Sequence, residues 1–248
     1  MAAPAYVNHA RSLHQRKHRA DLRRFLVQGR KGVEELLRSG FTVEALYATA
    51  EAAALPPFQH ATVVPAHHLE RMGTLESGNE VLAIVHMPDP AVLTVPAGHG
   101  FVLALDGVAD PGNLGTLLRI ADWFGATQVW CSEDCVDVWN PKCVQATMGS
   151  YLRVPVWYGD LAPALLTAHA AGVQVLKADA GGADAFGTAL QRPLVLVLGS
   201  ESHGLRPGVR QAPGITVAIP RSGGAESLNV SAAAAALCME IARQGATR

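Results

Sequence analysis

The stretch from Phe101 to Ala126, FVLALDGVADPGNLGTLLRIADWFGA, contains the pattern that decides the fold of this chain. Its first five residues form an uninterrupted apolar run, and a glycine-bearing turn and a segment long enough for a helix follow. Strands without polar alternation are buried on both faces, so this pattern predicts an α/β fold with a parallel sheet covered by helices. Similar runs rich in Val, Leu and Ile recur at Thr127–Cys131, Val173–Leu176, Leu194–Leu198 and Ile215–Ile219.

A smaller α/β unit is predicted upstream of this sheet. Pro88, Pro90 and Pro96 interrupt regular structure, so residues 88–99 are predicted to form a linker between domains of residues 1–96 and 97–248. At the other end, the alanine-rich segment Ser231–Arg243 predicts a closing helix capped by Ser231 or Asn229. The elements expected in the upstream unit are helices at Lys31–Arg38 and His67–Arg71 and strands at Val43–Ala48, Ala61–Val64 and Val81–His86.

The composition excludes several classes of protein. With 248 residues, 49% of them hydrophobic, the chain can bury a substantial core and is not disordered. It has no uncharged apolar run of the ~18–20 residues that a membrane helix needs, and its first residues lack a secretory signal. We therefore expect a soluble, cytoplasmic protein. Cys131, Cys135, Cys143 and Cys238 form no CxxC pair, so they are expected to be reduced thiols and no metal site is predicted.

Positive charge is concentrated at the amino end. Residues 1–40 contain nine Lys/Arg and three Asp/Glu, a net charge of +6, which leaves 11 minus 18, or −7, for the remainder. Such a density suits a polyanion, and RNA or DNA is the natural partner. The alternative is a solvated basic helix face without a partner. The predicted RNA-binding residues are Arg11, Arg16, Lys17, Arg19, Arg23 and Arg24.

Ligands of parallel α/β sheets bind in the loops that follow the strands, and three such loops carry polar residues. The first contains only Gly112 and Gly115, so the three-glycine fingerprint of a dinucleotide-binding oxidoreductase is absent. The second, Ser200–Gly204, resembles a hydrolase nucleophile elbow, but the only histidine downstream of Ser202 is the adjacent His203. Neither class is favoured.

Together the three loops carry an ordered set of motifs. These motifs are N-x-G-x-x-x-R at 113–119, LG-x-E at 198–201, and IP at 219–220 followed by SLNVS at 227–231. The set resembles the signature motifs of the SpoU-type (TrmH-like) RNA ribose methyltransferases of the SPOUT superfamily, over residues 100–244. Residues 25–40 resemble part of the small RNA-binding domain that often precedes this catalytic domain. Ser202 departs from the pattern, because many relatives have glycine there.

The resemblance implies a carboxyl-terminal domain tied in a trefoil knot, a homodimer with active sites near the subunit interface, and S-adenosyl-L-methionine as methyl donor. The implied reaction is methyl transfer to a ribose 2′-hydroxyl, with ribosomal RNA favoured over transfer RNA. A non-catalytic RNA-binding protein with this fold is the alternative of another class.

The resemblance also assigns roles to residues. Arg119 is implied to take the hydroxyl proton or to bind the RNA phosphate, the role that guanidinium geometry favours. Asn113 and Glu201 are expected to form a polar frame that orients Arg119 and the loops. Asn229 and Ser227 are expected to contribute hydrogen bonds to RNA or to the backbone of the third motif. The alternatives are structural. Asn113 and Asn229 could serve only as helix caps, Glu201 could be a solvated acid in a loop, and Arg119 could be an exposed arginine on a helix. The expected cofactor-binding residues are Gly199, Ile219, Leu228, Ser227 and Val230, of which Gly199 either allows close approach of the cofactor or is an ordinary turn glycine.

Overall fold

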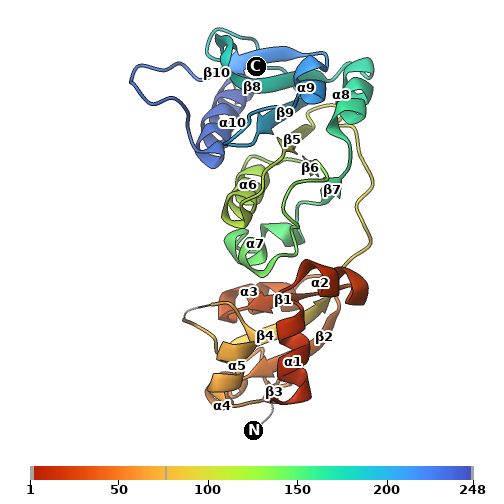
Figure 1. The fold of residues 1–248 in the computed structure, drawn as a ribbon, viewed down its shortest axis with the longest axis vertical. Helices are drawn as coiled ribbons and strands as arrows, with labels where there is room; N and C mark the ends of the chain where they lie inside the picture. Colours follow the sequence, from red (N-terminus) through yellow and green to blue (C-terminus); the bar gives the residue numbers. More distant parts are fainter. Residues whose placement is uncertain (1–2, 76, 247–248) are drawn as a thin grey trace. The chain divides into compact units, whose positions relative to one another are not determined.

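The computed structural model describes residues 3–75 and 77–246, and the chain divides into two compact units. The first unit consists of residues 1–89 and 137–152, and the second of residues 90–136 and 153–248 (Figure 1). No helix in the described part of the chain is long and apolar enough to span a membrane.

The first unit is built on a four-stranded sheet with the order β1-β4-β2-β3. The central strand β4 is antiparallel to β1 and β2, and the short β3 is parallel to β2. Apolar residues on both faces of β4 are buried, so helices cover the sheet on both sides. The strands are β1 (Arg24–Gln28), β2 (Val43–Ala48), β3 (Thr62–Val63) and β4 (Val81–His86).

Two apolar clusters fill the two sides of this sheet. On one side, Val7, Ala10 and Leu13 of the first helix pack with Leu69 and Met72. On the other side, the cluster includes side chains from residues 137–152, a segment that lies between two strands of the second unit in the sequence. The helices of this unit are α1 (Ala5–Ser12), α2 (Arg16–Leu22), α3 (Arg30–Leu37), α4 (Ala50–Ala53), α5 (Ala66–Met72), α7 (Pro141–Ala146) and the 3-10 turn η1 (Ser150–Leu152).

The second unit contains the predicted parallel sheet, with six strands in the order β10-β8-β9-β5-β6-β7. All six residues of β5 are buried, as expected for a central strand covered on both faces. The strands are β5 (Phe101–Asp106), β6 (Gln128–Cys131), β7 (Val156–Tyr158), β8 (Gln174–Asp184), β9 (Leu194–Gly199) and β10 (Ile215–Ala218).

Four helices pack on this sheet. Residues of α8 (Leu161–Ala170) and α9 (Pro207–Gln211) join the apolar cluster of β5, β8 and β9. The helices α6 (Pro111–Trp123) and α10 (Val230–Ala246) pack against each other, and α10 also contacts β9. This arrangement brings the starts of α6 and α10 together.

The predicted α/β class and parallel sheet are confirmed, and two details differ from the expectations. The sequence placed residues 137–152 with the second domain, whereas they pack with the first unit because Val144 and Tyr151 join its apolar cluster. The strands β1 and β7 were not predicted. No strand or helix lies between β4 and β5, in residues 87–100, all of which the structure describes.

Candidate functional site

Three loops at the carboxyl ends of β5, β9 and β10 lie together in the second unit. The first loop enters α6 at Pro111, and the carboxylate of Asp110 caps this helix by accepting a hydrogen bond from the Asn113 N–H at 2.8 Å. The second loop is closed by the side chain of Asp106, which is fully buried at the end of β5. Its two oxygens accept from the backbone N–H and the Nε of Arg206 at 2.7 and 2.6 Å.

One polar residue from each loop joins in a hydrogen-bonded frame. The Oε1 of Glu201 accepts from the Nδ2 atoms of Asn113 and Asn229, at 3.0 and 2.6 Å. Asn229 also donates to the Oδ1 of Asn113 at 3.1 Å. The sequence predicted a frame of Asn113 and Glu201, and the structure adds Asn229, which lies 116 positions after Asn113 in the chain.

Asn229 has a second role in this frame. Its Oδ1 accepts from the N–H groups of Ser231 and Ala232 at 2.9 and 3.4 Å, so it caps α10. Glu201 accepts in addition from the N–H of Val230 at 3.5 Å. The cap and the frame are therefore compatible functions of the same side chain, and they fix the start of α10 beside the second loop.

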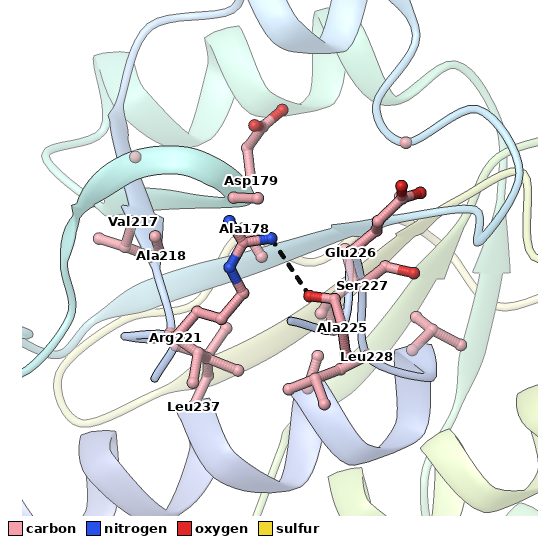
Figure 2. Close-up of a pocket in the computed structure, with 18 of the residues that line it drawn as sticks. Ala178, Asp179, Val217, Ala218, Arg221, Ala225, Glu226, Ser227, Leu228 and Leu237 are labelled. Atoms are coloured by element: carbon pink, nitrogen blue, oxygen red, sulfur yellow. Dashed lines mark hydrogen bonds between the residues drawn. The ribbon is translucent and has the colours of Figure 1, made fainter. Parts of the chain in front are cut away.

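A cavity of about 900 Å³ lies next to the frame. Its walls combine backbone, small apolar side chains and a few charged groups (Figure 2). The five residues predicted to bind a cofactor, Gly199, Ile219, Ser227, Leu228 and Val230, all line this cavity, as does Glu201.

The sequence missed two segments of the cavity wall. Residues 178–184 contribute through the long carboxyl-terminal extension of β8, and residues 221–226 form the loop between the two parts of the third motif. The extension shifts its register against β10 after Thr216, where the backbone of Gly182 approaches β10 so closely that a Cβ would lie 2.6 Å from Val217 C. The glycine pair at 181–182 was the available signal, because glycine within a strand marks a bulge or a close approach.

The charges of the cavity suit a cationic ligand. Its lining includes four carboxylates, those of Asp179, Asp184, Glu201 and Glu226, and a single cationic side chain, Arg221. One of these carboxylates, Asp179, forms an ion pair with Arg210 at 3.2 Å. Apolar walls suit a flat adenine ring, and the excess of carboxylates favours a sulfonium and an ammonium group. The residues present therefore fit S-adenosyl-L-methionine.

Gly199 meets the requirements of a turn glycine, the second of its two expected roles. A Cβ at this position would lie 2.2 Å from the carbonyl carbon of Gly204 and 2.5 Å from the nitrogen of Leu205. The loop returns across Gly199 because Ser200 and Gly204 pair in an isolated bridge. The glycine therefore allows close approach of its own loop, as a turn glycine does.

Arg119 does not join the frame. It is exposed on α6, six residues after Asn113, which puts the two side chains about 120° apart around the helix. It is absent from the lining of the cavity. Within residues 3–75 and 77–246, no hydrogen bond or ion pair of Arg119 is found. The expectation that Asn113 and Glu201 orient this arginine is therefore not met in the single chain.

The six predicted RNA-binding residues fall into two groups. Arg11, Arg16 and Lys17 are exposed. The other three, Arg19, Arg23 and Arg24, are held by protein groups.

Arg19 is a correction to the sequence prediction. The residue is 1% exposed, and its side chain donates to Asp137 Oδ2 at 2.7 and 3.0 Å and to the carbonyls of Leu13 and His14. These bonds engage its donors inside the first unit, so Arg19 is a structural residue. Arg24 donates to Glu44, and Arg23 to Asp89 at 3.0 Å.

Neither a hydrolase site nor a metal centre gains support from the geometry. The Oγ of Ser202 lies 2.7 Å from the Nδ1 of His203, but both residues are exposed neighbours on one loop. The four cysteines are buried, and none of them forms a disulfide bond within the described residues. Among the described residues, no group of three or more His, Cys, Asp or Glu side chains is placed to hold a metal ion.

Comparisons with known proteins identify both units. The model of the SpoU rRNA Methylase family matches residues 100–239, and the model of the MRM3-like substrate binding domain matches residues 5–84. The 23S rRNA (guanosine(2553)-2'-O)-methyltransferase RlmP of Bacillus subtilis is 30% identical over 247 residues, covering 93% of each chain.

Solved structures agree with these matches. A putative RNA methyltransferase of the TrmH family from Porphyromonas gingivalis is 35% identical, with a TM-score of 0.85 over 98% of this chain and 99% of that one. The SpoU methyltransferase AviRb from Streptomyces viridochromogenes, solved with its cofactor AdoMet (S-adenosyl-L-methionine), is 26% identical. Its TM-score is 0.88 over 99% of each chain.

Proposed function

The chain belongs to the SpoU rRNA methylase family, and on this premise we propose that it transfers a methyl group from S-adenosyl-L-methionine to a ribose 2′-hydroxyl of ribosomal RNA. The observation that carries the proposal is the cavity beside the Asn113–Glu201–Asn229 frame, because it unites all three family motifs around a space that suits the cofactor.

The residues of the chain have distinct tasks in this reaction. The bound cofactor supplies an electrophilic methyl group. The loops at Gly199, Ile219 and Leu228 hold it with backbone groups and apolar walls, and the frame fixes these loops relative to one another. Such fixed positioning of the two reactants is a major source of rate acceleration.

Arg119 acts on the RNA in this proposal. Its guanidinium is exposed and free of protein partners in the described chain, so it is available to a phosphate of the substrate. Guanidinium stays charged at ordinary pH, which favours phosphate binding over the role of general base. The phosphate contact would place the target ribose at the cavity.

Ribosomal RNA is favoured over transfer RNA by the extent of the similarities. Two proteins that match along nearly the whole chain, RlmP and an AdoMet-bound enzyme from Sinorhizobium meliloti, are named as rRNA methyltransferases. The structure described as methylating C/U34 on tRNA corresponds to 60% of this chain. The first unit, with exposed Arg11, Arg16 and Lys17, accordingly contacts the ribosomal RNA in the proposal.

A homodimer and a trefoil knot complete the proposed enzyme, which would work in the cytoplasm where ribosomal RNA is modified. The dimer is supported by two large apolar side chains exposed on the packed helices α6 and α10, Trp123 at 83% and Met239 at 60%. Trp123 lies one turn after Arg119 on the same face, so a partner covering it would lie near this arginine. Sedimentation of the wild type and of Trp123→Asp tests the dimer, which the substitution should dissociate.

Methyl transfer to RNA tests the proposed function. Radiolabelled S-adenosyl-L-methionine is incubated with the protein and with ribosomal RNA from a strain that lacks it, and 2′-O-methylation is then mapped. Arg119→Ala should lower transfer at least a hundredfold and leave the calorimetric affinity for the cofactor unchanged, because Arg119 lies outside the cavity. Label in transfer RNA alone would identify transfer RNA, not ribosomal RNA, as the substrate. Cofactor binding without any methyl transfer would indicate a non-catalytic RNA-binding protein.

A further inference from the structure

We propose that Arg221 binds the carboxylate of the methionine part of S-adenosyl-L-methionine, and that it makes the cavity selective for ligands with this group. The inference rests on the proposed function, because it assigns one residue to one chemical group of the expected cofactor. Arg221 belongs to none of the three motifs that pointed to the site.

The first argument for this role of Arg221 is the charge distribution of the cavity. The cofactor has two cationic groups, the sulfonium and the ammonium, and one carboxylate. Four carboxylates line the cavity, although Glu201 already accepts hydrogen bonds from the frame, so the lining has an excess of negative charge that opposes a ligand's carboxylate away from Arg221. Arg210, which lies outside the lining, is paired with Asp179. Among the lining residues that the structure describes, Arg221 is thus the one side chain that can neutralise the ligand's carboxylate.

The second argument is the position of the Arg221 side chain. Its NH1 donates to the carbonyl oxygen of Ala225 at 3.2 Å, a bond that closes the loop and holds the side chain across the cavity (Figure 2). This bond leaves the remaining guanidinium donors without a protein partner in the described chain. A carboxylate can accept from two of them in parallel, the geometry that guanidinium favours.

The backbone offers no competing anion site at the nearby helix start. Helix N-termini attract carboxylates when their N–H groups are free. At the start of α10, however, the N–H groups of Val230, Ser231 and Ala232 donate to the side chains of Glu201 and Asn229. These side chains already supply the acceptor that a ligand's carboxylate would otherwise provide.

Calorimetric binding of two ligands to the full-length protein tests the assignment. The ligands are S-adenosyl-L-methionine and its decarboxylated analogue, which keeps the sulfonium and the ammonium but lacks the carboxylate. We expect the wild type to prefer the complete cofactor by about tenfold or more. Arg221→Gln should lose this preference by weakening only the complete cofactor, and Arg221→Lys should keep part of it because the charge remains.

Arg153→Gln is the matched control, since it removes an exposed arginine of the same unit that does not line the cavity. If Arg221→Gln still preferred the complete cofactor over the decarboxylated analogue as the wild type does, the assignment would be overturned. Equal weakening of both ligands would also overturn it, because it would indicate a structural role of Arg221 in the loop. Absence of cofactor binding to the wild type would instead overturn the proposed function and the assignment with it. Thermal melting of each variant establishes that it is folded.

Discussion

Gly199 and Gly223 both line the cavity, but the structure gives them opposite tolerance to a side chain. An added Cβ at Gly199 meets the backbone of Gly204 and Leu205 within 2.5 Å, whereas one at Gly223 meets nothing within 4 Å. Backbone atoms cannot swing aside as a side chain can, so the second loop would have to open to admit even a methyl group.

We predict that Gly199→Ala lowers the free energy of unfolding by about 2 kcal/mol or more and weakens binding of S-adenosyl-L-methionine. The loss of stability should be present without ligand, because the collision lies within the protein. Thermal denaturation and calorimetry measure the two effects, and Gly223→Ala serves as the matched control. A Gly199→Ala protein with wild-type melting would contradict the collision.

Site residues that belong to a recognisable sequence motif were predictable from the sequence, and site residues outside such motifs were not. The order and spacing of Asn113, Glu201 and Asn229 indicated a shared site, and the structure joins them by hydrogen bonds. The cavity wall at 178–184 depends on a register shift between β8 and β10, which no local pattern specifies. Arg221 was missed because a single arginine in a loop has no spacing to identify it.

At the scale of elements, α2 shows how local charge misleads. Arg16, Lys17 and Arg19 appear equivalent in the sequence, but helical geometry turns Arg19 inward to Asp137, which is 118 residues away. The sequence could not reveal this partner, because residues 137–152 join the first unit only in the folded chain.

We predict that Arg19→Ala destabilises the first unit by about 3 kcal/mol, because it leaves the carboxylate of Asp137 without its buried cation. Arg16→Ala, which removes an exposed arginine from the same helix, should change stability by less than about 0.5 kcal/mol. Urea denaturation followed by circular dichroism compares the two variants. Equal, small effects would show that the Arg19–Asp137 pair does not support the fold.

The first sheet contains an ion pair whose contribution to the stability of the protein depends on pH. A hydrogen bond from Arg24 on β1 lowers the pKa of the Glu44 carboxyl on β2 below its ordinary value of 4.5, against the effect of burial. His9 on α1 and His86 on β4 also face this carboxylate, at 3.4 and 3.7 Å. A carboxyl with a lowered pKa in the folded state stabilises the protein above its unfolded pKa, and this stability is lost as the pH falls through the folded value.

We therefore predict that Glu44→Gln lowers the free energy of unfolding by about 0.5 kcal/mol at pH 7, a small value because solvent screens this partly exposed pair. The difference from the wild type should shrink as the pH falls below 4.5 and through the lowered pKa of Glu44. Urea denaturation at pH 7, 5 and 3.5 measures it. Glu70→Gln, which removes an exposed carboxylate without an ion pair among the described residues, is the control. A constant difference at all three pH values would be contrary to this linkage.

At the scale of the whole molecule, the positive charge and the cavity belong to different units. The net charge of +6 in residues 1–40 belongs to the first unit, and the cavity with its four carboxylates to the second. The sequence alone suggested removing residues 1–24 to test the role of the basic end. The structure argues against that deletion, because it would remove Val7, Ala10 and Leu13 from the apolar core and Arg19 from its ion pair.

Substitution of exposed cations is the sharper experiment. In a variant with Arg11, Arg16 and Lys17 all changed to Gln, we predict weaker binding to ribosomal RNA and a flatter dependence on salt. The log-log slope should fall by about 0.7–0.9 for each phosphate that the protein no longer neutralises, hence by about 2–3 for three phosphates. The weakening should be similar for unrelated RNA sequences, because cations on phosphates position RNA without reading its bases. Affinity for S-adenosyl-L-methionine and the melting temperature should stay at wild-type values, since the cavity residues all lie in the other unit. An unchanged salt slope would mean that these cations form only a solvated face, and the RNA contact would then have to lie elsewhere on the two units.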